Sequence, residues 1–167
     1  MWFGRLRVGL AAEHGFFYRL PGEQLWHSAE SDVDLSWKDV VLPIMQYFTD
    51  RTPGTYIEDK EISLTWHYRD ADPHFGVWQA KDMQIHMEDV LSTLPIDIWQ
   101  GNNMVEVRYR NASKASVVDE VYRWFRDQIA SGELSKVDFV LSIGDDRSDE
   151  EVFSTVKHWK EVAVAYA

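Results

Sequence analysis

One stretch of the chain, residues 139–153, restricts the fold more than any other. It begins with an apolar, β-branched segment, Phe139 to Ile143, which is typical of a buried strand in a parallel sheet. The segment stops at Gly144, and a helix is expected shortly afterwards, with Ser148 as its N-cap and acidic residues in its first turn. A strand that leads through a short loop into a helix is the repeating unit of α/β proteins.

Three carboxylates lie in that loop and at the start of the helix: Asp145, Asp146 and Asp149. In open α/β sheets, ligands bind outside the carboxyl ends of the strands. Carboxylate oxygens at such a place suit Mg2+, which is usually held by a few carboxylates, water and substrate phosphate. The simpler interpretation is that these acids only cap a helix and solvate a turn. The complete succession of strand, Gly-Asp-Asp-Arg-Ser-Asp-Glu loop and helix favours the metal site.

Composition excludes several classes of protein. At 167 residues the chain is long enough for one ordinary core or two small lobes. No window has the roughly 18 consecutive apolar residues that a membrane helix needs, and the N-terminus lacks the apolar stretch of a signal peptide. The absence of cysteine excludes disulfides and favours an intracellular, cytoplasmic location. A net charge of −11 argues against a nucleic-acid partner.

The expected elements form two α/β pieces separated by an inset. In the first piece, strands are predicted at residues 5–12 and 15–20, a loop at 21–34 and a helix at 35–50. In the last piece, a helix, a strand, a helix and a strand are predicted at residues 113–129, 139–143, 149–160 and 162–166. The inset is predicted as a ββαββ unit with strands at 56–60, 62–69, 96–99 and 104–109 and a helix at 73–94.

This order predicts a division into two parts. We expect residues 1–54 and 111–167 to form a partial core and residues 55–110 to form a cap inserted into it, with a turn at 52–55 as a hinge. A cap between two core pieces is a natural lid over a site at the strand ends.

Lys114 is the candidate for phosphate binding. It follows Ser113, the expected N-cap of the helix after the cap. The free N–H groups and the positive dipole end of a helix N-terminus attract phosphate, and a lysine there adds a mobile positive charge. The alternative is a solvated lysine at a helix start. Its position one helix before the acidic loop favours the phosphate site.

Two further sets of residues are candidates for substrate contacts. Glu106 and Arg108 share one face of their expected strand, and a carboxylate that accepts beside a guanidinium that donates suits sugar hydroxyls. The alternative is that this face is the solvated side of an antiparallel sheet. Glu13, His14 and Gly15 lie between two apolar strands and form either a substrate contact or a tight turn.

Histidine and tryptophan residues carry weaker signals. His67 faces away from Trp66 on its expected strand, which is typical of a structural histidine. The six histidines show no spacing that indicates zinc. Trp37, Trp78 and Trp124 lie at helical core spacing and are predicted to be core residues rather than platforms for sugar rings.

Segments spread in order over nearly the whole chain resemble the trehalose-6-phosphate phosphatase family of the haloacid dehalogenase superfamily. They are Gly9–Phe16, Ile57–Glu61, Thr65–Pro73, Phe75–Gly76, Gln79–Lys81, Val105–Val107, Ser113–Lys114 and Ile143–Glu150. The residues of these motifs most resemble the phosphatase portions of two-part synthase–phosphatase proteins of plants and related eukaryotes.

The resemblance implies an α/β fold with a Rossmann-like core and a small α/β cap, and Mg2+-dependent hydrolysis of trehalose 6-phosphate to trehalose and phosphate. It implies a synthase domain as a partner. It assigns roles to residues in three groups: metal binding to Asp145, Asp146 and Asp149, phosphate stabilisation to Lys114, and sugar recognition to Glu106 and to Glu13, His14 and Gly15.

One departure from the family pattern concerns the nucleophile. In the family it lies in an Asp-x-Asp-Gly-Thr motif after the first core strand, upstream of the segment that matches Gly9–Phe16. The nearest candidate here, Asp32-Val-Asp34, follows that segment and lies in an expected loop. In the superfamily the first Asp is phosphorylated and the second acts as acid and base. We therefore expect this chain alone to be inactive and interpret it as the C-terminal part of a phosphatase domain: a fragment, a partial gene product or a degenerate copy.

Two functions remain as hypotheses. The first is the cap and metal half of a trehalose-6-phosphate phosphatase, active only when its N-terminal strand is supplied. The second is a non-catalytic module that binds the sugar phosphate or docks to a synthase.

Overall fold

The computed structural model describes residues 6, 8–110, 112–145, 148–159 and 163–166. The chain divides into two compact units: unit 1 consists of Met1–Ser31 with Ala112–Ala167, and unit 2 consists of Asp32–Asn111. Among the described residues, no helix combines the length and the apolar character that crossing a bilayer requires.

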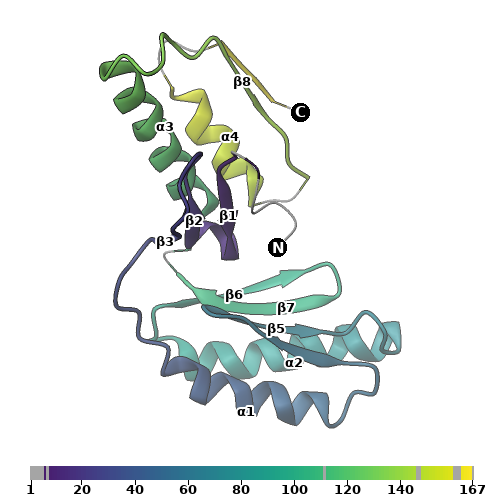
Figure 1. The fold of residues 1–167 in the computed structure, drawn as a ribbon. Helices are drawn as coiled ribbons and strands as arrows, with labels where there is room; N and C mark the ends of the chain where they lie inside the picture. Colours follow the sequence, from purple (N-terminus) through teal and green to yellow (C-terminus); the bar gives the residue numbers. More distant parts are fainter. Residues whose placement is uncertain (1–5, 7, 111, 146–147, 160–162, 167) are drawn as a thin grey trace. The chain divides into compact units, whose positions relative to one another are not determined.

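Unit 2 is a four-stranded antiparallel sheet with two helices against one face (Figure 1). Its elements are α1 (Trp37–Thr49), β4 (Tyr56–Asp59), β5 (Ser63–His67), α2 (Pro73–Leu91), β6 (Ile96–Gly101) and β7 (Met104–Tyr109). The strand order is β4-β5-β7-β6. The predicted ββαββ succession is confirmed, and Asp72 caps α2 by accepting hydrogen bonds from the backbone N–H groups of His74 and Phe75.

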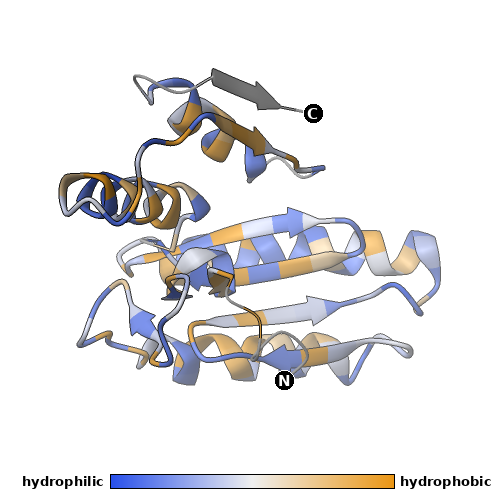
Figure 2. Cartoon of the chain, turned by 45° about the horizontal axis from the view of Figure 1, so that its top comes forward, coloured by the Kyte–Doolittle hydropathy of each residue, from blue (hydrophilic) through white to orange (hydrophobic). Residues whose placement is uncertain are grey.

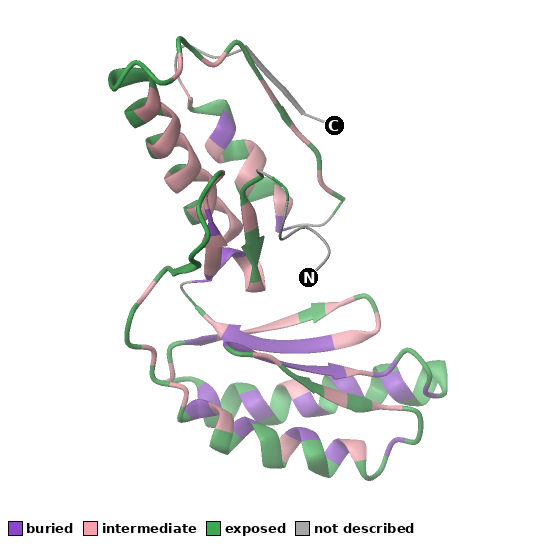
Figure 3. Cartoon of the chain, in the orientation of Figure 1, coloured by how far each residue is buried: buried purple, intermediate pink, exposed green. Residues whose placement is uncertain are grey.

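Alternation along the central strands explains why this sheet has one apolar face. Leu64 and Trp66 of β5 and Val105 and Val107 of β7 are fully buried and form the centre of the core with the two helices. Apolar and polar residues alternate along the strands in Figure 2, and the buried residues of unit 2 lie on the sheet and on both helices in Figure 3. The sheet thus keeps a second face, which carries Glu106 and Arg108.

Helix α2 has large apolar residues on its exposed side as well as on its buried side. Met83, Met87 and Leu91 are buried, together with the small residues Gly76 and Ala80. The prediction that Trp78 is a core residue is wrong, because its side chain is 60% exposed. Small residues let the helix backbone approach the sheet, as shown by Gly76, where an added Cβ would lie 3.0 Å from the Tyr68 ring.

Helix α1 belongs to unit 2, whereas the sequence-based division placed it with residues 1–54. Trp37, Val41, Met45 and Phe48 are its buried residues, and all four join the same core cluster as α2 and the sheet. The structure therefore divides the chain at Ser31, ahead of the helix, rather than at the turn after it. Helical periodicity identifies the buried side of α1 but says nothing about which sheet that side meets.

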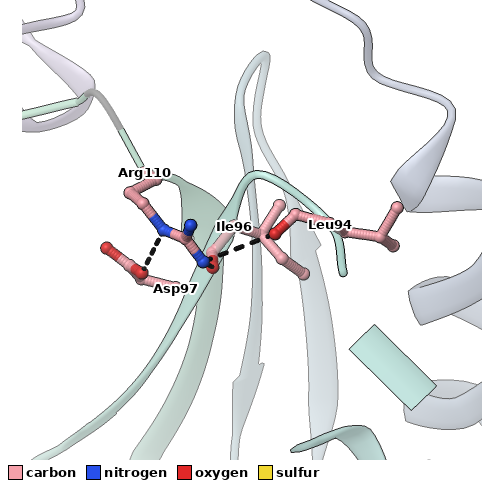
Figure 4. Close-up of polar contacts among 4 residues, drawn as sticks. All are labelled: Leu94, Ile96, Asp97 and Arg110. Atoms are coloured by element: carbon pink, nitrogen blue, oxygen red, sulfur yellow. Dashed lines mark hydrogen bonds and ion pairs between the residues drawn. The ribbon is translucent and has the colours of Figure 1, made fainter. Parts of the chain in front are cut away.

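The end of β7 is tied to the start of β6 by Arg110 (Figure 4). Its Nε donates to Asp97 Oδ1 at 3.0 Å, and its Nη2 donates to the carbonyl oxygens of Ile96 at 2.9 Å and Leu94 at 3.4 Å. One guanidinium thus satisfies three acceptors at the point where the chain leaves the sheet.

Unit 1 has two small sheets and two main helices. Its elements are β1 (Leu10–Ala12), the 3-10 turn η1 (Glu13–Gly15), β2 (Phe17–Arg19), β3 (His27–Ser28), α3 (Lys114–Ala130), β8 (Phe139–Ser142), α4 (Asp149–Lys157) and β9 (Ala163–Tyr166). β1, β2 and β3 are antiparallel. The segment 21–34, predicted as a loop, therefore contains a short strand. β8 and β9 are parallel and joined through α4, as predicted for an α/β protein.

Unit 1 has far fewer buried apolar side chains than unit 2. Among the described residues they are Phe16, Ala112 and Val156, and α3 has no buried residue. The prediction that Phe139 to Ile143 is buried is wrong, because Phe139 is 59% exposed and Leu141 is 54% exposed. No described element covers that face of β8, which is apolar (Figure 2) and exposed (Figure 3).

The contrast predicts that unit 2 folds by itself. We expect residues 32–111 alone to unfold in one cooperative transition, followed by circular dichroism in urea. In that segment Met83→Ala should lower the free energy of unfolding by about 2–5 kcal/mol, since it empties a fully buried site.

The matched control is Ile85→Ala on the same helix, where the side chain is 64% exposed and the change should stay within about 0.5 kcal/mol. Equal effects of the two substitutions, or a non-cooperative transition, would contradict this description of the core.

Candidate functional site

The N-termini of α3 and α4 are held together by two side-chain contacts. Lys114 Nζ lies 2.8 Å from Asp149 Oδ1, and the hydroxyl of Ser113 donates to Glu151 Oε2 at 3.0 Å. Both contacts join the first residues of one helix to the first turn of the other. The structure thus brings together Lys114 and Asp149, which the sequence singled out separately.

The start of α3 follows from its N-cap. Ser113 has an extended backbone, and its Oγ accepts a hydrogen bond from the N–H of Ala115 at 3.1 Å, which confirms the predicted cap. The same hydroxyl is then a donor to Glu151, so that it serves both helices. Lys114 is the first residue of α3, where the helix dipole disfavours a cation, and Asp149 supplies the compensating charge.

The turn η1 packs directly against the start of α3. Gly15 has φ of 87°, and a Cβ built on it would lie 2.8 Å from Ser113 O, 2.8 Å from Val117 Cγ2 and 3.3 Å from Lys114 Cα. Only glycine combines this backbone angle with so close an approach. Glu13 and His14 are also left-handed, with φ of 47° and 54°. The structure therefore confirms a tight turn and places it beside Lys114.

The acidic loop is packed against α4 in a similar way. A Cβ added at Gly144 would lie 2.4 Å from the Cβ of Asp149, so the chain after β8 passes directly over that side chain. Asp145 comes next and is exposed. Asp146 lies outside the described residues, so its predicted role as a metal ligand stays a prediction.

The loop has a donor set that fits a hard cation. Among the described residues, no three histidine or acidic side chains are grouped closely enough to hold a metal ion. Carboxylate oxygens of Asp145 and Asp149 are nevertheless of the type that Mg2+ selects. The hydroxyl of Ser148 is buried and has no hydrogen-bond partner within the described residues, and it does not cap α4, contrary to the predicted N-cap bond. A buried polar atom without a partner beside carboxylates is consistent with a bound ion or water.

Glu106 and Arg108 lie in unit 2, on the face of the sheet opposite the core. Glu106 is 4% exposed and Arg108 is 8% exposed, so the interpretation of this face as a solvated surface is wrong. The guanidinium carbon of Arg108 lies 4.4 Å from the ring centroid of Trp99, a cation–π contact that fixes its direction. Trp99 and Thr65 are the strand neighbours of Glu106 on either side.

Sequence reasoning missed two residues of these sites. Glu151 was assigned only to the first turn of a helix, although it bonds Ser113 from 38 positions away. Trp99 lies at the end of a predicted strand, and that pattern does not reveal its cation–π contact with Arg108. Glu151 lies on the same helical turn as Asp149, and Trp99 lies on the same strand face as Asp97. These patterns are compatible with the observed contacts, but ordinary surface residues show them too.

The comparisons with known proteins give one family. The trehalose-phosphatase family matches residues 2–166 of the chain. The probable alpha,alpha-trehalose-phosphate synthase (UDP-forming) 11 of Arabidopsis thaliana is 41% identical over 159 residues, which cover 94% of this chain and 18% of that protein. Alpha,alpha-trehalose-phosphate synthase (UDP-forming) B of Dictyostelium discoideum is 40% identical, with coverage of 93% and 18%. The chain thus spans less than a fifth of the length of these relatives.

Solved structures agree with this result. The C-terminal domain of trehalose-6-phosphate phosphatase from C. albicans has a TM-score of 0.81 and 34% identity, over 93% of this chain and 55% of that chain. The C-terminal domain of a Candida albicans trehalose synthase regulatory protein has a TM-score of 0.71 over 95% of this chain and 63% of that chain. At 19% identity, the second similarity shows the fold alone.

The close packing of η1 predicts a specific effect of Gly15→Ala. The alanine would be strained at φ of 87° and would also displace the start of α3, so we expect a loss of about 2–4 kcal/mol in the free energy of unfolding. The measurement is chemical denaturation of the whole chain followed by tryptophan fluorescence.

Gly22→Ala is the matched control. Gly22 has φ of 89°, but a Cβ there meets nothing within 4 Å, so only the strain of about 1 kcal/mol should appear. Equal losses at the two positions would show that η1 does not press on the helix.

Proposed function

The chain belongs to the trehalose-phosphatase family, and on this basis we propose that it carries the metal side and the cap of a phosphatase that hydrolyses trehalose 6-phosphate with Mg2+. The observation that carries the proposal is the contact of Lys114 with Asp149 at the meeting of two helix N-termini, with Gly15 against the same helix start. Ammonium, helix ends and carboxylates there form a site for a phosphate together with a cation.

Lys114 would bind the phosphate. Its ammonium has three donors, one of which is directed at Asp149, and its side chain is 36% exposed. The donors that Asp149 does not occupy are available to phosphoryl oxygens. The N-terminal ends of α3 and α4 add positive partial charge at the same place, which offsets the net charge of −11 locally.

Asp145 and Asp149 would hold Mg2+, with Asp146 as a further ligand that lies outside the described residues. When bound, the ion neutralises charge on the phosphoryl oxygens. Asp149 then has a double role, since the same carboxylate orients Lys114. Its side chain is 15% exposed and is enclosed by Gly144, which keeps the carboxylate in one position.

The sugar part would be recognised by the polar turn and by the cap. Glu13, His14 and Gly15 are placed by η1 at the start of α3. Glu106 and Arg108 offer an acceptor and donors on one sheet face. We propose these five residues as substrate contacts.

The chain contains no Asp-x-Asp-Gly-Thr motif. In the proposed mechanism the nucleophile therefore comes from a segment outside residues 1–167. Residues 1–167 alone would bind the substrate but would not hydrolyse it. The named relatives are trehalose-phosphate synthases, and we propose a synthase domain as a covalent or docked partner and the cytoplasm as the location.

The first test is calorimetric titration of the chain with trehalose 6-phosphate. We expect binding in the presence of Mg2+ and at least tenfold weaker binding with EDTA, because the metal offsets repulsion between phosphate and carboxylates. Phosphate release should stay at the background rate. Absence of binding with Mg2+ present would reject both the phosphatase and the binding-module hypothesis.

The second test supplies the nucleophile. The chain preceded by a strand that ends in Asp-x-Asp-Gly-Thr should release phosphate from trehalose 6-phosphate. Lys114→Ala and Asp145→Asn should each lower kcat/KM at least 100-fold, because both remove stabilisation of transferring phosphate.

Lys136→Ala and Asp138→Asn are the matched controls, since these residues form an exposed ion pair in the same unit. They should leave kcat/KM within twofold. Binding that persists in every extended form without any phosphate release would favour the alternative, a non-catalytic sugar-phosphate-binding or synthase-docking module.

A further inference from the structure

We propose that the surface groove between α1 and α2 is a docking site for an amphipathic helix that carries lysine or arginine beside its apolar face. The docked helix is assigned to the synthase domain, so its source rests on the proposed function, whereas the groove itself does not. The groove lies wholly within unit 2, and none of its residues has a role in the proposed mechanism.

The groove is largely apolar and large enough for a bulky side chain. Its volume is about 440 Å³, and it is lined by residues of both helices: Pro43, Ile44, Tyr47, Phe48, Asp82 and His86. Phe48 belongs to the core cluster, whereas Tyr47 is 51% exposed, so the groove runs from the core to the surface. A partner helix that enters such a groove inserts a large apolar residue as its anchor.

Exposed apolar side chains continue the groove along both helices. On α2, Trp78 lies one turn before Asp82 and Ile85 lies three residues after it, and the two apolar side chains are 60% and 64% exposed. On α1, Val40 lies one turn before Ile44 and is 41% exposed. An apolar surface that follows helical spacing over several turns is typical of a site that receives another helix.

Asp82 brings a carboxylate into this apolar lining. It makes no hydrogen bond or ion pair with the residues that the structure describes, so it is available to a cation from a partner. Docking would remove water from the carboxylate, which favours a partner that supplies a lysine or arginine there. Helix α2 as a whole is acidic, with Asp82, Glu88 and Asp89 against the single lysine Lys81.

The charge of the chain argues against two other occupants. A second copy would bring the same acidic helix to the groove, and its net charge of −11 would add repulsion. An anionic lipid surface would be repelled for the same reason. A basic helix from a synthase domain is complementary in charge, and the named relatives are synthases with more than four fifths of their length outside the matched segment.

The test titrates the whole chain with two synthetic helical peptides of about 20 residues, followed by fluorescence anisotropy. Both peptides carry leucine along one face, and the flanking positions are lysine in one peptide and glutamate in the other. We expect the lysine peptide to bind and the glutamate peptide to bind at least about tenfold more weakly. Absence of binding by the lysine peptide, or equal binding of both, overturns the inference.

Two substitutions test the groove itself. Tyr47→Ala and Asp82→Asn should each weaken binding of the lysine peptide about tenfold. The matched controls are Tyr56→Ala, at a tyrosine that is 53% exposed on β4, and Asp89→Asn, at an acid of α2 that does not line the groove. They should change the affinity less than about twofold. Equal effects of the two aspartate variants would indicate general charge attraction and overturn the inference. Thermal unfolding checks that every variant is folded.

Competition tests the source of the helix. The part of the Arabidopsis thaliana relative outside the matched segment should displace the lysine peptide, and failure to displace it overturns the assignment to the synthase. Self-association of the chain that Tyr47→Ala abolishes would assign the groove to a second copy. Binding to phosphatidylserine vesicles that Tyr47→Ala abolishes would assign it to lipid. Either result overturns the inference.

Titration with trehalose 6-phosphate separates this inference from the proposed function. Tyr47→Ala and Asp82→Asn should bind the sugar phosphate as the unchanged chain does. Peptide binding without any binding of trehalose 6-phosphate supports the docking site and contradicts the proposed function. Binding of trehalose 6-phosphate without peptide binding overturns the docking site and leaves the function standing.

Discussion

The meeting of two helix N-termini is the constraint on which the rest of unit 1 depends. Each terminus carries positive partial charge, so placing α3 and α4 start to start is unfavourable unless anions lie between them. Asp149 and Glu151 provide those anions, and Lys114 and Ser113 bind them. The glycines at positions 15 and 144 allow the neighbouring backbone to close in on the pair. These contacts explain how a small unit with few buried apolar residues can still hold the two helix ends in one arrangement.

Local patterns were sufficient for most elements and for part of the site. Alternation identified β5 and β7, helical spacing identified α1 and α3, and Ser113 was identified as an N-cap because its side chain satisfies a backbone donor nearby in sequence. These signals arise from interactions within a few residues, or from a single buried face, and such information is present in any window of the chain. The proximity of Lys114 to Asp149 followed from the order of elements, since α/β connectivity brings strand and helix ends to one edge.

What failed depends on partners distant in sequence. Trp78 and Met83 are both apolar residues at helical spacing on α2, and the packing of the helix on the sheet, which the local sequence does not contain, leaves the first exposed and the second buried. α1 was grouped with its chain neighbours, whereas its core contacts are with β5 and α2. The apolar residues Phe139 and Leu141 predict a buried strand, but both are exposed in the structure. The sequence of a strand does not show whether another element packs on it.

The left-handed backbone of Glu13 and His14 has a consequence for how this chain can change. Residues with a Cβ hold such angles at a free-energy cost of order 1 kcal/mol or more each, and glycine or asparagine would relax them. Selection for stability alone would favour those replacements, so the presence of Glu13 and His14 at these angles calls for a reason other than stability. A screen for heat resistance would therefore be expected to select glycine or asparagine at these two positions, and such variants would lose the carboxylate and the imidazole that the turn now carries.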